Sequence, residues 1–279
     1  MTFSLAARDP ATGAFGLVLS SSSPAVGARC PHLRPGVGAA ASQNVTNPAL
    51  GPRLLDLLQA GATAPEAIAA VTAEEPHPEY RQLAVVDAAG RVAHFSGARV
   101  LGTHATATGH QAVAAGNLLA GPPVVRAMVD AYEAATQASA ATGAAFEERL
   151  LAGFLAGLAA GGEQGPVRSA GLAVVEDVPW RVTDLRVDDA DDPAAELSRL
   201  LALWLPQKRD YLVRAIDPSV APSYGVAGDR RREHLGDTAR SNSVFRTVAC
   251  FAFPVQAKHA TVRDKKSLTL RLPGRDPRA

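Results

Sequence analysis

Residues 2–21, TFSLAARDPATGAFGLVLSS, decide the fold of this chain. An apolar run over 2–8 leads into Asp9-Pro10-Ala11-Thr12-Gly13, and a second apolar run covers 15–21. Proline fixes φ and glycine accepts a positive φ, so the five intervening residues predict a turn. The sequence therefore predicts an antiparallel hairpin at the start of the chain.

The rest of the chain continues this pattern of paired strands, with helices in blocks between them. Apolar runs bounded by turn residues predict strands over 36–43, 83–87, 91–96, 112–116, 169–176 and 181–187. Helical spacing of apolar residues predicts helices over 48–59, 65–74, 122–135, 146–160 and 193–215. Adjacent strand pairs and grouped helices indicate an α+β fold rather than alternating βαβ units.

The composition is that of a globular protein without strong overall charge. The chain has 279 residues, with 28 Lys and Arg against 27 Asp and Glu, and 47% hydrophobic residues. This balance argues against a nucleic-acid partner, and the sequence holds no apolar run of about 18 residues that would cross a membrane. The first residues lack a basic start followed by an apolar stretch, so we expect no secretory signal and a cytoplasmic location.

Charge nevertheless divides the chain into two parts. Residues 229–279 hold 12 Lys and Arg against 5 Asp and Glu, whereas the preceding body is acidic and rich in alanine. We expect a folded domain over 1–228 and a basic, disordered tail over 229–279. A nucleic-acid-binding arm is the weaker interpretation, because the aromatic residues of the tail lie away from its basic run.

The start of the chain carries the most specific chemical hypothesis. A small residue at position two favours removal of Met1, and this would leave Thr2 with a free α-amine. The hydroxyl of threonine is a weak nucleophile until a base takes its proton, and an amine with a pKa near 8 can be that base. Many proteins begin with Met-Thr without any catalytic reason, so position two alone leaves both interpretations open.

Several motifs in order resemble one bacterial family. They are Thr2-Phe3-Ser4-Leu5-Ala6-Ala7-Arg8-Asp9-Pro10, Ala25-Val26-Gly27, Ser42-Gln43, Thr46-Asn47-Pro48, Arg81-Gln82-Leu83-Ala84-Val85-Val86-Asp87, Gly116-Asn117-Leu118-Leu119-Ala120-Gly121-Pro122, Asp184-Leu185-Arg186-Val187 and Pro222-Ser223-Tyr224-Gly225-Val226. Over residues 2–228 the chain resembles the domain of unknown function 1028 family, which belongs to the N-terminal nucleophile hydrolases.

This resemblance implies both a fold and a chemistry. The fold would be a four-layer αββα sandwich, with two stacked antiparallel sheets that are flanked by helices. Thr2 would attack the carbonyl of a small or non-peptide amide, and water would hydrolyse the acyl-enzyme. We expect a small-molecule amide as partner, no cofactor and no metal, with a homo-oligomer as an option. The alternative is a catalytically degenerate member that serves as a binding or assembly module.

The resemblance also assigns site residues, each with a structural alternative. The expected catalytic residues are Thr2, Asp9 and Asn117, and the expected substrate-binding residues are Arg8, Gln43, Thr46, Asn47, Arg81, Gln82 and Arg168. Asp9 could equally cap the turn that follows it, Asn117 could be a turn residue, and Arg81 could form a solvated salt bridge. The asparagine amide would donate to the developing oxyanion.

The chain departs from the family pattern at one important position. Relatives usually have Lys or Arg after the second strand, where this chain has Ser22. A nearby cation lowers the pKa of an amine, so its loss favours the degenerate alternative unless Arg168 supplies the charge from elsewhere. A third and weaker hypothesis is an enzyme of another class that uses Cys30 as its nucleophile.

Overall fold

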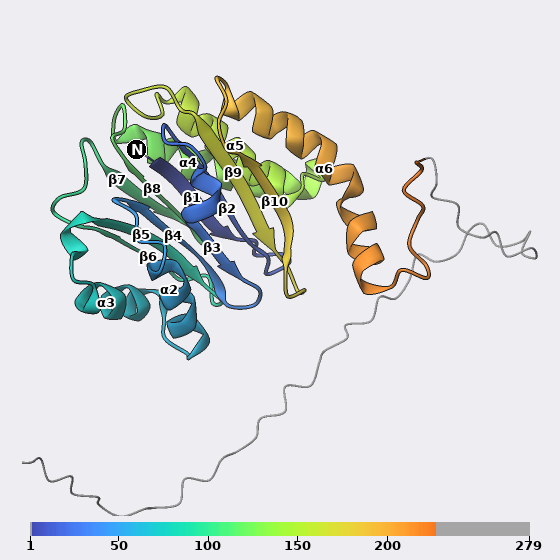
Figure 1. Ribbon diagram of the computed structural model, residues 1–279, viewed down its shortest axis with the longest axis horizontal. Coiled ribbons are helices and arrows are strands. Elements are labelled where there is room, and N and C mark those ends of the chain that lie inside the picture. Colours follow the sequence, from blue (N-terminus) through green and yellow to red (C-terminus); the bar gives the residue numbers. More distant parts are fainter. Residues whose placement is uncertain (1, 227–279) are drawn as a thin grey trace, which may run out of the picture. The chain divides into compact units, whose positions relative to one another are not determined.

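Strand β1 (Thr2–Arg8) lies inside a six-stranded antiparallel sheet, with a neighbour on each side (Figure 1). The computed structural model describes residues 2–226, and its contacts divide the chain after Pro222. The tail that we predicted over 229–279 lies outside the described residues. Within the described part, no helix has the length and apolar character needed to cross a bilayer.

The strands form two sheets. The first has the order β10-β9-β2-β1-β8-β7 and the second β3-β4-β5-β6, and all pairings are antiparallel. The other strands of the first sheet are β2 (Phe15–Ser21), β7 (Ala105–Gly109), β8 (Ala112–Asn117), β9 (Ser169–Val175) and β10 (Arg181–Val187). The strands of the second are β3 (Pro31–Arg34), β4 (Gly38–Asn44), β5 (Arg81–Asp87) and β6 (Val92–Ser96).

Helices cover the outer face of each sheet, as Figure 1 shows. Those on the second sheet are α2 (Leu50–Gln59) and α3 (Ala64–Glu74), and those on the first are α4 (Pro123–Thr142), α5 (Phe146–Ala159) and α6 (Pro193–Ile216). Short α1 (Val26–Arg29) and the 3₁₀ turn η1 (Pro78–Tyr80) lie in connections. The expected αββα sandwich is therefore confirmed.

Strand alternation assigns each residue of β1 to one of two layers. Phe3, Leu5 and Ala7 pack in the core under α4 and α5, whereas Ala6 lies in the core between the sheets. That inter-sheet layer is built largely from small side chains. Its buried members include Ala6, Phe15, Leu17, Leu19, Ala39, Ala41, Ala84, Val86, Val113 and Ala115.

Most predicted elements are confirmed, with small differences at their ends, except that α4, predicted over 122–135, continues to Thr142. The hairpins of β1 with β2, β5 with β6 and β9 with β10 all form, and Asp192 caps α6 by accepting from the Ala195 N–H at 2.9 Å. The prediction missed strands β3 and β7 and the one-turn helix α1. Strands β3 and β7 lie at sheet edges, where half-buried residues leave a weak apolar pattern.

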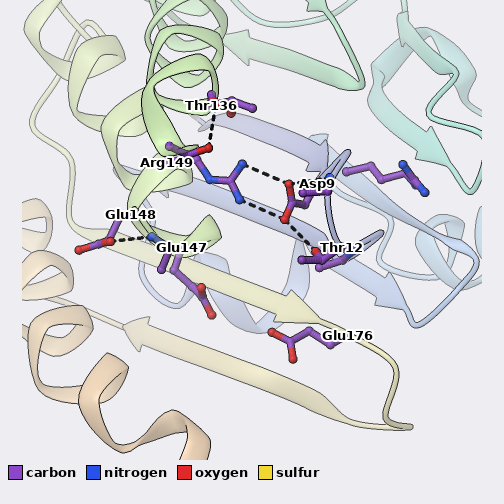
Figure 2. Close-up of polar contacts among 12 residues, drawn as sticks. Asp9, Thr12, Thr136, Glu147, Glu148, Arg149 and Glu176 are labelled. Atoms are coloured by element: carbon purple, nitrogen blue, oxygen red, sulfur yellow. Dashed lines mark hydrogen bonds and ion pairs between the residues drawn. The ribbon is translucent and has the colours of Figure 1, made fainter. Parts of the chain in front are cut away.

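A buried ion pair fastens the far end of β1 to helix α5. Arg149 donates to both carboxylate oxygens of Asp9 at 3.1 Å, and the Thr12 hydroxyl donates to the same carboxylate at 2.7 Å (Figure 2). Burial would raise the pKa of Asp9, but the hydrogen bonds from Arg149 and Thr12 and the Arg149 charge hold it below its usual value. The turn after β1 is thus clamped to the helix layer.

We expect Asp9→Asn to lower the free energy of unfolding by about 3–5 kcal/mol at pH 7, because the Arg149 charge stays buried without its partner. Because the pKa of Asp9 is lowered in the folded state, ionised Asp9 stabilises the folded chain fully at pH values above the unfolded pKa near 3.9. It is lost as the pH falls through the folded pKa. Urea unfolding at pH 7 and at pH 3 measures both effects.

The matched control is Asp130→Asn, which removes an exposed carboxylate that pairs with Arg126 along α4. That pair should contribute less than about 1 kcal/mol. Equal stability of Asp9→Asn and the unmodified chain at pH 7 would contradict the buried clamp.

Candidate functional site

Thr2 begins β1 in the middle of a row of polar side chains. Its partner in β8 is Asn117. On the other side, Phe3 pairs with Ser20 of β2, so the next residue, Ser21, lies beside Thr2. The Thr2 hydroxyl lies 3.5 Å from the Ser21 hydroxyl. By alternation with Ala6, these three side chains belong to the inter-sheet face, which changes here from apolar to polar. Thr2 is 4% exposed, so the row is buried.

Two glutamines from the second sheet meet this row. Gln43 on β4 accepts from the Ser4 hydroxyl at 2.7 Å and donates to the Gln82 side-chain oxygen at 2.9 Å. Gln82 on β5 also accepts from the Asn117 amide at 3.0 Å and donates to the Gly116 carbonyl at 3.0 Å. The predicted residues Gln43, Gln82 and Asn117 are therefore brought together next to Thr2, in one buried hydrogen-bonded group that joins both sheets.

The side-chain amide of Asn117 has one N–H group that Gln82 does not use. Its side-chain nitrogen carries two N–H groups, and one of them is used by Gln82. The side-chain oxygen accepts no hydrogen bond from the described residues. The next residue, Leu118, adopts φ 50°, a left-handed conformation that turns the chain sharply away from the sheet. The turn holds Asn117 at the end of its strand, opposite Thr2.

The structure adds Ser4, Ser21 and Glu163 to the residues that the sequence indicated. Alternation from Thr2 would have placed Ser4 and, across the hairpin, Ser21 on the same face. Glu163 follows the helix stop Gly161-Gly162, and no sequence signal marked it. Burial raises its pKa to about 7, against the lowering effects of the amino-terminal charge and the Ser22 N–H.

Two predicted residues, Arg8 and Asp9, are not brought to Thr2. They lie at the opposite end of β1, where Asp9 is paired with Arg149 and Arg8 donates to the Gln111 side chain at 2.7 Å. Arg8 lines an open hollow of about 510 Å³ together with Thr12 and Glu176. This hollow is separated from Thr2 by the length of the strand.

Of three other predicted residues, Arg81 and Asn47 contact Glu75, and Thr46 lies beside Cys30. Arg81 donates through Nε and Nη2 to Glu75 at 3.1 and 2.8 Å, and Asn47 donates to Glu75 at 3.1 Å. Thr46 lies 3.8 Å from the Cys30 sulfur. These contacts stabilise the loops that follow β4 and precede β5.

The guanidinium of Arg168 is held by carboxylates. It donates to both oxygens of Asp189 at 2.9 Å and to Asp191 at 2.5 Å, while its backbone N–H donates to the Ser21 carbonyl at 2.8 Å. Its backbone therefore supports the site, and its charge is neutralised at the surface. The guanidinium that we expected to supply a charge to the site is thus engaged by two carboxylates.

Cys30, the alternative nucleophile, is buried beside Thr46. Burial raises the pKa of Cys30, so its thiol stays protonated at neutral pH and is a poor nucleophile. Within residues 2–226, no three His, Cys, Asp or Glu side chains are grouped to hold a metal ion.

Known proteins resemble this chain to different degrees. A search of curated proteins found no match. Among solved structures, protein SPO2555 from Silicibacter pomeroyi is similar with a TM-score of 0.65 and 31% identity, over 72% of this chain and 88% of that one. Anbu, the ancestral beta-subunit from Yersinia bercovieri, aligns over 74% of this chain and 95% of its own, with a TM-score of 0.33 and 10% identity. The model of the family of unknown function DUF1028 matches residues 2–197, and the chain therefore belongs to that family.

Proposed function

We propose that this protein is an amide hydrolase whose nucleophile is the hydroxyl of Thr2. Removal of Met1 makes Thr2 the first residue of the mature chain. The observation that carries the proposal is the place of Thr2. It opens a central strand, its side chain faces the inter-sheet layer between Asn117 and Ser21, and the family match begins at this residue. Resemblance to the N-terminal nucleophile hydrolases supports the same assignment.

The chemistry would follow from the groups at this end of the sheet. Thr2 Oγ bonds to the amide carbonyl carbon while its proton passes to the α-amine, and the carbonyl π electrons move to oxygen. The unused N–H of Asn117 stabilises that oxyanion. The C–N bond then breaks, and the leaving nitrogen takes the proton from the ammonium group. Water attacks the ester, the amine accepts its proton, and Thr2 Oγ leaves and recovers that proton.

A second candidate function is a binding or assembly module without turnover. It is favoured by the serine at position 22 and by the pairing of Arg168 with Asp189 and Asp191, because a nearby free cation would lower the pKa of the amine. The two candidates differ at the first step, since only the enzyme needs a free α-amine on Thr2.

We expect intact mass to show a chain without Met1, and a β-lactone probe to acylate Thr2. Thr2→Ala should abolish the labelling, and Thr2→Ser should retain it, because serine keeps the hydroxyl next to the amine. Thr72→Ala is the matched control, since Thr72 lies on α3 and its hydroxyl bonds only locally, to Ile68 and Ala69 carbonyls. A retained Met1, or a label on another residue, would exclude Thr2 as the nucleophile.

We expect Asn117→Ala to slow acylation of Thr2 by about 100-fold or more, because an oxyanion donor is lost. The rate constant of labelling, followed by mass spectrometry, measures the effect. Circular dichroism and thermal unfolding establish that the variant is folded. An unchanged rate in a folded variant would remove Asn117 from the machinery.

We expect Gln82→Met to lower the free energy of unfolding by at least about 2 kcal/mol. The buried amides of Gln43 and Asn117 would lose their acceptor, and each unsatisfied buried group costs about 1–3 kcal/mol. Urea unfolding measures the loss. Gln137→Met, at an exposed position of α4, is the matched control and should stay within about 0.5 kcal/mol. Equal effects of the two substitutions would contradict a tightly satisfied polar group.

A further inference from the structure

Glu163 spans the gap between the two strands that flank the start of β1. Its backbone pairs with Leu119, two residues beyond Asn117, and Gln164 N–H donates to the Leu118 carbonyl at 2.9 Å. Its carboxylate Oε2 accepts the Ser22 N–H at 3.0 Å, one residue beyond Ser21. Since Asn117 and Ser21 are the neighbours of Thr2, the carboxyl group lies across the point where β1 begins.

The carboxyl group has unused bonding capacity in a buried position. Glu163 is 6% exposed, and its Oε1 accepts no hydrogen bond from the residues that the structure describes. A buried carboxylate oxygen without a partner is costly, so such a group points to a donor that binds there in the working state. The Thr2 chemistry does not otherwise use it.

The surroundings of Glu163 leave one positive group to fill this role. The β2 side offers Ser21 and Ser22, the β8 side offers the 117–119 segment, and the α5 side offers Gly161 and Gly162; all of these are uncharged. Arg168 is held by Asp189 and Asp191. The remaining positive charge that acts on the pKa of Glu163 is the amino terminus, and the same charge acts on the pKa of the buried Cys30 thiol.

We propose that Glu163 is the positioning residue for the α-amine of Thr2, with Oε1 accepting a hydrogen bond from that amine once Met1 is removed. The inference rests on the proposed function, because it requires Thr2 to be the mature amino terminus. The carboxylate holds the amine toward the Thr2 hydroxyl. In the charged form the pair is an ammonium beside a carboxylate, and moving one proton from nitrogen to Oε1 gives the neutral amine that the attack needs.

The sign of the electrostatic effect follows from this geometry. A carboxylate within about 4–6 Å favours the ammonium form and raises the pKa of the amine by about 1–3 units. Glu163→Gln keeps the size of the side chain and an oxygen for the Ser22 N–H, but it removes the charge. The amine in this variant should therefore titrate about 1–3 pH units lower.

The test measures the amine directly, in the Thr2→Ala background, where the α-amine is present and the nucleophile is absent. The amine is reductively methylated with ¹³C-formaldehyde and cyanoborohydride as the hydride donor, and its ¹³C signal is titrated by NMR with and without Glu163→Gln. The matched control is Glu196→Gln, which alters an exposed carboxylate paired with Arg199 on α6 and should leave the titration unchanged. A fall confined to Glu163→Gln supports the proposal, and an unchanged titration overturns it.

Two further measurements separate this inference from the proposed function. If native Thr2 is acylated but Glu163→Gln changes neither the amine titration nor the pH profile of labelling, the positioning role fails and the nucleophile stands. If the titration shifts but Thr2 is never labelled, the positioning role stands and the hydrolase proposal fails. If Glu163→Gln does not fold, the amine is titrated in the chain that keeps Glu163. Two inflections in this titration are expected, because the amine and the carboxyl group are coupled. A single inflection near pH 8, the value of a free α-amine, overturns the pairing.

Discussion

Burial of both faces of β1 is the constraint on which the rest of this structure depends. One face packs against α4 and α5 through Phe3 and Leu5, and the other lies between the sheets. A strand with two buried faces cannot slip by one residue without moving every side chain to the wrong layer. The position of Thr2 is therefore fixed by packing that extends along the whole strand.

The two ends of β1 are held by different kinds of polar interaction. At the far end, the charged pair of Asp9 and Arg149 clamps the turn to a helix. At the near end, uncharged amides from Gln43, Gln82 and Asn117 satisfy one another between the sheets. The acidic group at the near end is Glu163, whose carboxylate accepts from the Ser22 N–H rather than from a charged partner.

The sequence predicted the strands, turns and helices that depend on local residue patterns. It did not predict contacts between residues that are far apart in the chain. The β1–β2 hairpin follows from its turn residues, and the placement of Gln43 and Asn117 at strand ends followed from motif position. The partner of Asp9 is 140 residues away, so only the folded chain shows that Arg149 uses its carboxylate. Glu163 joined the site for the same reason: it follows a glycine turn, and its neighbours Ser22 and Leu119 come from other parts of the chain.

The small side chains between the sheets have an effect that reaches beyond packing. Ala41 on β4 and Ala84 on β5 lie two residues from Gln43 and Gln82 respectively, on the same faces. Substitution of either alanine by valine or leucine would add volume between the sheets and increase their separation near Gln43 and Gln82. Gln43 donates across this gap to the Ala115 carbonyl at 3.1 Å, which leaves little slack for a wider spacing. The methyl groups of Ala41 and Ala84 thus set how far these amides must reach, so a larger side chain at either position would disturb the polar group as well as the packing.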